Sequence, residues 1–338
     1  MNSEFETERT ERDGKPQING GPSHSNKAKS RWLVGCVVVP LVLIGILGAT
    51  SFVYMKWFAP KVDPDLKNPD VVFNEDGGGV DSIESGILAG FSKEAIASAD
   101  HPLEPALELA RRGLTRMDEE VQDYTATLVK QIRYKGKLLP PDHLEVKIRH
   151  ESSKGDDPVP FSVYTKMLSP QAKLGIEAIY VEGWNDNNIA AHPNFPFGNL
   201  RINLPINGML AMREQLHPIT MIGLKNLLRQ TIKKGERDLA HQECTIEINY
   251  NVEIDGCKCL LIEITHPEPR DHFEFHIARI YIDIEREVPV GYEGFLWPEE
   301  EGGEPLLFEK YIYTDLELNV GLEDEDFSPD NEAYGYPG

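Results

Sequence analysis

A run of 24 residues, Trp32–Met55, contains no charged side chain and is bracketed by Arg31 and Lys56. As a helix it would be ~36 Å long, which is enough to cross the ~30 Å hydrocarbon core of a bilayer with some tilt. Trp32 and Tyr54 lie near its two ends, where membrane helices carry interfacial aromatic residues. The run therefore predicts one membrane-spanning helix over residues 32–55.

Two features of this run need a separate explanation. Pro40 lies inside it, and a proline is tolerated there because the neighbouring structure in a membrane satisfies the freed backbone groups. The small residues 49–51 resemble the cleavage site of a signal peptide, which is the alternative to an uncleaved anchor. Against cleavage, the preceding leader is long and the apolar run continues from Phe52 to Met55.

The flanking charges predict the orientation. Basic residues outnumber acidic ones just before the run, whereas Lys56 and Lys61 after it are diluted by Asp63 and Asp65. This bias favours a cytoplasmic N-terminus and places the main domain on the exported, periplasmic side of the membrane bilayer. We expect a disordered tail at 1–31, the membrane helix at 32–55, a flexible tether at 56–100 and a folded domain at 101–338.

Composition narrows the functional classes. The formal net charge is -22, from 56 acidic and 34 basic residues, so the chain would repel the phosphates of a nucleic acid. The four cysteines include one in the apolar run, and the remaining three do not form a disulfide framework. We find no phosphate-binding loop, nucleophile elbow or metalloprotease helix, and we predict neither a cofactor nor an enzyme. A hydrolase with residues assembled from distant strands stays an alternative.

The domain is predicted to be rich in strands. Apolar and polar residues alternate over 144–149, and the pair Asp255-Gly256 separates two strand-like runs as a two-residue hairpin turn would. In the register that this turn implies, residues 252 and 250 would face 259 and 261. Helical spacing is found at 103–117, 207–216 and 221–233. The predicted class is α+β with one large antiparallel sheet, which at such a width tends to curl.

One strand is apolar on both faces. Leu260, Ile262 and Ile264 alternate with Leu261 and other residues of the second hairpin strand. Such a strand could have one face on a core and the other on a ligand cavity, or both faces could be packed; these two possibilities stay open. We take Leu260, Ile262 and Ile264 as candidate ligand-binding residues.

Two clusters could bind metal. His272, Glu274 and His276 would project to one face of a strand and could hold zinc, or they could form a polar row facing solvent. Cys257 and Cys259 would likewise share a face, and we interpret them as small buried apolar residues.

Residues from about 105 to 336 resemble an uncharacterised family of bacterial exported or membrane-bound proteins, which is itself related to the outer-membrane lipoprotein-sorting carriers. The matching segments are 123–131, 145–150, 160–167, 175–183 and the tail 318–334. The resemblance implies a strongly curved, half-open antiparallel barrel with helices on its concave side, where the carriers hold acyl chains. Arg149 occupies a strand end comparable to that of an arginine that latches the carriers, but the insertion 152–160 after it departs from their pattern.

Two functions follow as hypotheses. The first is a tethered binding domain that holds a lipid or a lipoprotein acyl chain in a cavity of the sheet. The second is a structural or interaction protein of the cell envelope that has no small ligand and uses its acidic surface for contacts.

The predicted anchor can be tested directly on membranes. We expect the full-length protein to stay with membranes after carbonate washing, because the helix at 32–55 would span the bilayer. A protein that begins at Val62 should be recovered in the supernatant. A mature N-terminus at or near Phe52 would instead show that the segment is a cleaved signal peptide.

Overall fold

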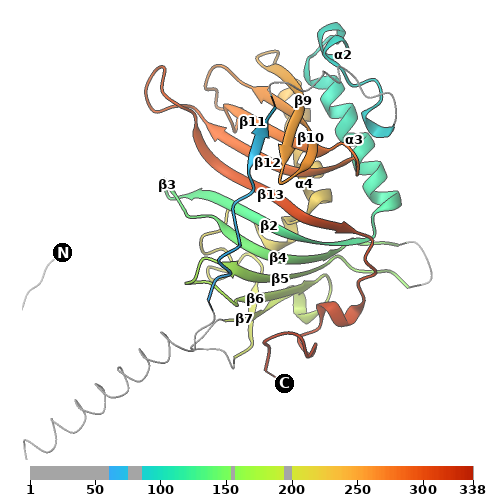
Figure 1. Ribbon diagram of the computed structural model, residues 1–338, viewed down its shortest axis with the longest axis vertical. Helices are drawn as coiled ribbons and strands as arrows, with labels where there is room; N and C mark the ends of the chain where they lie inside the picture. Colours follow the sequence, from blue (N-terminus) through green and yellow to red (C-terminus); the bar gives the residue numbers. More distant parts are fainter. Residues whose placement is uncertain (1–60, 75–85, 154–156, 194–199, 338) are drawn as a thin grey trace, which may run out of the picture. The chain divides into compact units, whose positions relative to one another are not determined.

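The computed structural model describes residues 61–74, 86–153, 157–193 and 200–337. Within these ranges the chain forms one antiparallel sheet and three α-helices, which confirms the predicted α+β class (Figure 1). The strand order is β1-β9-β10-β11-β12-β13-β2-β4-β5-β6-β7-β8, and β3 pairs with β2 outside this path.

The first half of the chain gives the strands β1 (Val71–Phe73), β2 (Asp123–Tyr134), β3 (Lys137–Leu138), β4 (Asp142–Arg149), β5 (Ser162–Ser169), β6 (Glu177–Val181), β7 (Asn188–His192) and β8 (Ile202–Pro205). The second half gives β9 (Thr245–Ile254), β10 (Cys257–Thr265), β11 (Ile277–Asp283), β12 (Val288–Leu296) and β13 (Leu306–Leu318). The helices are α2 (Lys93–Ser98), α3 (Leu103–Glu120) and α4 (Leu224–Asp238), with short 3-10 turns η1 (Gly86–Leu88), η2 (Asn185–Asn187), η3 (Ile219–Met221) and η4 (Asp324–Phe327).

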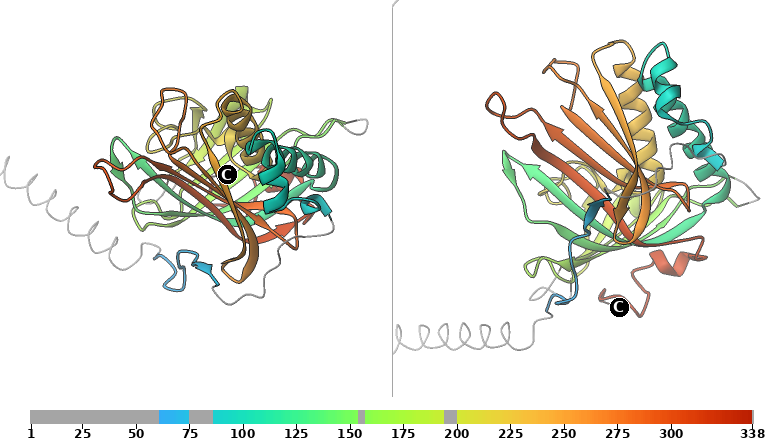
Figure 2. Two further views of the ribbon diagram at one scale, coloured as in Figure 1. Left: turned by 90° about the horizontal axis from the view of Figure 1, so that it is seen from above. Right: turned by 45° about the horizontal axis from the view of Figure 1, so that its top comes forward.

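Helices α3 and α4 pack side by side against one face of the sheet (Figure 2). The helical spacing in the sequence correctly predicted α3, whose buried residues include Leu103, Leu107 and Met117. It also predicted most of α4, which buries Leu224 and Leu228. Each helix therefore places one apolar stripe toward the sheet.

The helix predicted at 207–216 is wrong. This segment forms turns, and Glu214 has a φ of 54°. A left-handed backbone at a residue other than glycine interrupts a right-handed helix, so apolar spacing alone could not make one here.

The hairpin between β9 and β10 turns at the predicted dipeptide. Asp255 and Gly256 have φ values of 50° and 79°, as a type I′ turn requires at both central positions. Cys257 pairs with Ile254 as expected. A β-bulge between Cys259 and Leu261 then shifts the register by one, so that Leu261 faces Asn249 rather than residue 250.

The sheet is strongly curved. Ile262 of β10 and Ile189 of β7 line the same cavity although eight strand spacings separate their strands. On a flat sheet they would lie about 38 Å apart, at ~4.8 Å for each spacing. The sheet curves so that both reach the wall of one cavity, with α3 and α4 on that side (Figure 2).

Part of the predicted tether at 56–100 belongs to the folded unit. Strand β1 pairs with β9 at one edge of the sheet. Leu88 and Phe91 are almost completely buried in the core that α3 shares with β10 and β11. Strand pairing therefore holds residues 71–73 on the domain, and apolar burial holds residues 86–91, despite the glycine-rich stretch between them.

The predicted membrane segment, with Trp32, Pro40, Tyr54 and Met55, lies outside the described residues. Among the residues that the structure does describe, no helix is both long and apolar enough to cross a bilayer.

Two tyrosine hydroxyls of the sheet hold the beginning of α4. The backbone N–H of Leu224 donates to the Tyr124 hydroxyl of β2 at 2.9 Å, and the N–H of Gly223 donates to the Tyr313 hydroxyl of β13 at 3.1 Å. Gly223 has a φ of 106°, and a Cβ there would lie 2.8 Å from the Tyr124 oxygen. Glycine is required because this close approach replaces the usual side-chain cap of a helix N-terminus.

This attachment can be tested by removing one oxygen atom. Tyr124→Phe would leave the buried N–H of Leu224 without its acceptor, so we expect the free energy of unfolding to fall by about 1–3 kcal/mol. Tyr134→Phe, at the other end of the same strand, is the matched control and should change stability by less than about 0.5 kcal/mol. Denaturant unfolding of both variants measures the difference. Equal stabilities would mean that the hydroxyl does not hold the helix.

Candidate ligand-binding site

A cavity of about 700 Å³ lies between the curved sheet and the two long helices. Its walls include Leu128 of β2, Met167 of β5 and Ile264 of β10 from the sheet. Leu107 of α3 and Leu227 of α4 form part of the helical side. A volume of this size is within the range of ligand sites and is far larger than the voids of a packed core.

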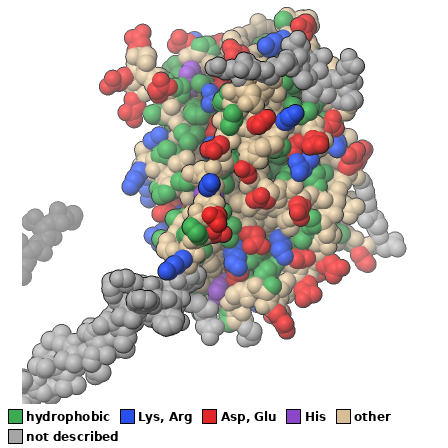
Figure 3. Space-filling view, in the orientation of Figure 1, with side chains coloured by type: hydrophobic (Ala, Val, Ile, Leu, Met, Phe, Trp, Pro, Cys, Tyr) green, Lys and Arg blue, Asp and Glu red, His purple; other side chains and the backbone are tan. Residues whose placement is uncertain are grey.

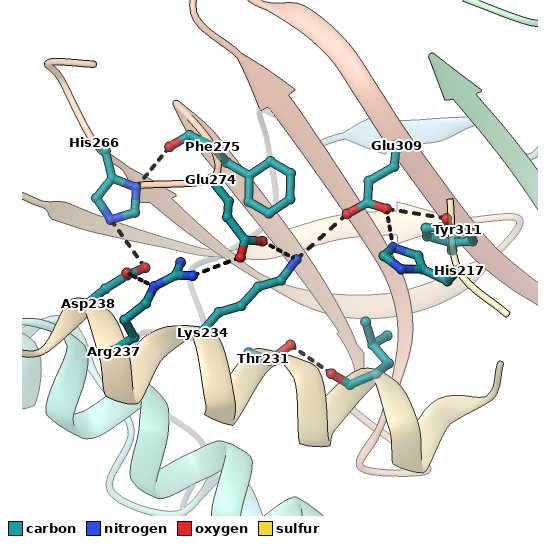
Figure 4. A network of polar contacts seen from close by, with 11 residues as sticks. His217, Thr231, Lys234, Arg237, Asp238, His266, Glu274, Phe275, Glu309 and Tyr311 are labelled. Atoms are coloured by element: carbon teal, nitrogen blue, oxygen red, sulfur yellow. Dashed lines mark hydrogen bonds and ion pairs between the residues drawn. The ribbon is translucent and has the colours of Figure 1, made fainter. Parts of the chain in front are cut away.

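One end of the cavity carries a network of charged groups centred on Lys234 of α4 (Figure 4). The Lys234 Nζ atom lies 3.1 Å from Glu274 Oε2 and 3.8 Å from Glu309 Oε1. The same ammonium lies over the ring of Phe275, 4.3 Å from its centroid. Lys234 thus connects α4 both to β13 and to the loop before β11.

Glu309 is the buried acid of this network, with only 2% of its side chain exposed. Besides Lys234, it contacts His217 Nε2 at 2.9 Å and accepts a hydrogen bond from the Tyr311 hydroxyl at 3.3 Å. Because a buried carboxylate is costly without partners, these contacts explain how it is tolerated on the cavity wall.

Glu274 and Asp238 extend the network toward the end of α4 (Figure 4). Arg237 donates to Glu274 Oε1 at 2.8 Å and to Asp238 Oδ1 at 3.2 Å. Burial works to raise the pKa of Glu274, but the hydrogen bond from Arg237 and the charge of Lys234 outweigh it and lower that pKa. Glu274 therefore stays ionised and paired.

Tyr292 of β12 lies beside this network. Its side chain is buried, and within the described part of the chain its hydroxyl has no hydrogen-bond partner. Burial raises the pKa of Tyr292 well above its ordinary value, and the nearby Glu309 and Glu274 add to the rise, so the hydroxyl stays protonated. A buried donor without an acceptor is destabilising, and a ligand oxygen within reach would satisfy it.

A second polar cluster lies at β2, and its members Lys130, Lys173, Glu214 and Gln215 line the cavity. Lys130 Nζ donates to Gln215 Oε1 at 2.7 Å and lies 3.2 Å from Asp142 Oδ2. Lys173 bridges Asp142 and Glu214, each at 3.0 Å. Burial lowers the pKa of the Lys130 ammonium, although the Asp142 carboxylate opposes the shift. These contacts hold the turns of residues 206–217 against the sheet.

Sequence reasoning missed both clusters, because their members come from distant parts of the chain. The available signal for Lys130 was its position in β2, where it follows Leu128 and Val129 and precedes Ile132 by two residues. Glu309 gives a weaker signal, because it lies between Phe308 and Lys310 in a strand of mixed character.

The candidate ligand-binding residues are distributed over two places. Ile262 and Ile264 line the cavity. Leu260 is fully buried in the same apolar cluster but is not part of the lining. Arg149 lies elsewhere: its guanidinium donates to Asp324 Oδ1 at 2.7 Å and lies over the ring of Phe327. Arg149 thus secures the C-terminal segment and is outside the cavity wall.

The metal candidates do not share a strand face, because residues 266–276 form a loop and β11 begins only at Ile277. His272 stacks on His241 with centroids 3.6 Å apart, Glu274 pairs with Arg237, and His276 contacts the carbonyl of His266. Among the described residues, no group of three potential ligands is placed to hold a metal ion. Cys257 and Cys259 are free thiols, of which Cys259 is buried.

The solved structures that the chain resembles include three bacterial proteins. A DUF1329 family protein from Desulfovibrio piger has 13% identity and a TM-score of 0.33, over 68% of this chain and 98% of its own. A putative outer membrane lipoprotein-sorting protein domain from Vibrio parahaemolyticus has 12% identity and a TM-score of 0.28, over 65% and 97%. A LolA superfamily protein from Nitrosomonas europaea has 12% identity and a TM-score of 0.26, over 65% and 97%.

No curated protein matches the chain. The family model described as protein of unknown function (DUF1571) matches residues 121–336, which is close to the span predicted from the sequence. The matched span includes β2 through the C-terminal segment, and with them α4 and most of the cavity wall. The chain therefore belongs to the DUF1571 family.

Proposed function

We propose that the domain binds an amphiphile, a lipid or the acyl chain of a lipoprotein, in the cavity between the sheet and helices α3 and α4. The observation that carries this proposal is a cavity of about 700 Å³ with aliphatic walls and charged groups at separate places on its lining. An acyl chain would bury its methylene groups against Ile262, Ile264 and Leu227, at ~0.8 kcal/mol for each group. The proposal concerns binding and includes no chemical reaction.

The charged groups of the lining support an amphiphile over a purely apolar ligand. Lys234, Glu274 and Glu309 lie at one part of the wall, so a polar headgroup has hydrogen-bonding partners there. Lys130 and Lys173 do the same near β2. A headgroup at either cluster would keep its polar atoms satisfied while the chain occupies the apolar part.

The alternative of an envelope interaction protein rests on the acidic surface. On the face shown in Figure 3, acidic side chains are spread among lysine and arginine side chains rather than gathered into one area. On that side of the domain there is therefore no concentrated acidic area that an envelope partner could bind. It would regain support if no apolar ligand binds.

Filling the cavity tests the proposal. Ala278 of β11 lines the cavity, and Ala278→Phe should weaken binding of a fluorescent fatty acid by at least about tenfold, or ~1.4 kcal/mol, because the ring takes the ligand's space. The matched control is Ala333→Phe on the exposed C-terminal segment, which should leave binding unchanged. Fluorescence titration of the full-length protein measures both, and thermal melting checks the fold. Unchanged binding in a folded Ala278→Phe variant would place the ligand elsewhere.

A further inference from the structure

The turns of residues 206–217, which we name the mouth segment, carry the most exposed large apolar side chains in the described part of the chain. Met209 is 87% exposed and Leu210 is 61% exposed. Leu210 also belongs to the lining of the cavity. Single exposed apolar residues are common on proteins, but two adjacent ones at the edge of an apolar cavity are a feature to explain.

The inner side of the mouth segment is fixed, so its apolar tip is held outward. Glu214 pairs with Lys173 at 3.0 Å, and Gln215 accepts from Lys130 at 2.7 Å. The tip itself is a tight turn, in which the N–H of Gly208 donates to the carbonyl of Pro205 at 2.8 Å. Met209 and Leu210 therefore remain in solvent unless a partner covers them.

The charge next to this tip indicates the kind of partner. Arg213 is exposed and belongs to the lining of the cavity, and within the described ranges its guanidinium forms no ion pair. Methionine and leucine beside an unpaired arginine match a bilayer surface, where apolar side chains enter the acyl region and the cation meets anionic headgroups.

The course of the N-terminal segment supports the same partner. The N–H of Val62 donates to Gln171 Oε1 at 3.2 Å, and Gln171 is two residues from Lys173, the partner of Glu214. The chain thus enters the folded unit beside the mouth segment. Lys61 follows Met55, the end of the predicted anchor, by six residues, which can span at most about 20 Å.

We propose that the mouth segment contacts the lipid bilayer through Met209, Leu210 and Arg213, so that the cavity opens at the membrane surface. This contact is a second interaction of the domain, distinct from ligand binding in the cavity, and its partner is the membrane surface. It depends on the predicted anchor at 32–55 and is independent of which ligand the cavity holds.

Photo-crosslinking in vesicles tests the contact. Full-length protein carrying p-benzoylphenylalanine in place of Met209 would be reconstituted in vesicles of phosphatidylcholine and phosphatidylglycerol with an alkyne-tagged lipid. The matched control has the same replacement at Val320, which is also exposed and follows the end of β13 that pairs with the beginning of β2. We expect several-fold more lipid adduct at position 209 than at 320. Adding Arg213→Gln should reduce the adduct at 209 in these anionic vesicles and have no effect in pure phosphatidylcholine.

Equal adduct at positions 209 and 320 in membrane-held protein would overturn the proposed contact. Release of the protein from the vesicles by carbonate would also overturn it, because the anchor would then be absent. Fatty-acid titration of the same variants separates this result from the proposed function. A protein that binds fatty acid but gives no adduct at 209 loses only the membrane contact.

Discussion

The cavity depends on the way in which the sheet holds both ends of helix α4. At its beginning, the hydroxyls of Tyr124 and Tyr313 accept the backbone N–H groups that no helical carbonyl can reach. Near its end, Lys234 reaches across to Glu309 of β13. The helix is therefore fixed over the concave face at two points, and the sheet and helices enclose space between them that side chains do not fill.

The polar groups of the cavity wall are costly to bury, so their presence there indicates a role other than stabilising the fold. Desolvation of Lys130 and Asp142 offsets much of their mutual attraction, so a buried ion pair of this kind contributes little net stability. The same holds for Glu309 beside Lys234. A closed apolar core would be at least as stable without them. Lys130, Lys234 and Glu309 lie on the cavity wall, a position that fits groups that meet and orient a ligand headgroup while the apolar surface around them receives its chain.

Sequence patterns predicted those parts of the fold that local chemistry decides. The positive φ of Asp255 and Gly256 follows from their residue types, and α3 follows from its apolar spacing. The register shift after Cys259 and the turn at Glu214 depend on bulges and backbone strain that the apolar pattern does not encode. The charged clusters escaped prediction because strand order brings together residues that are far apart in sequence, as with Lys130 and Gln215. The doubly apolar strand predicted a cavity only as one of two possibilities.

The most direct test of a ligand cavity is native mass spectrometry of the full-length protein, purified in a detergent of defined mass. We predict a second charge-state series, heavier by the mass of one co-purified amphiphile, which organic extraction removes and which Ala278→Phe reduces. A spectrum that shows only the mass of the bare polypeptide, both before and after addition of fatty acid or phospholipid, would contradict a ligand cavity. The space between α4 and the sheet would then have no role in binding lipid.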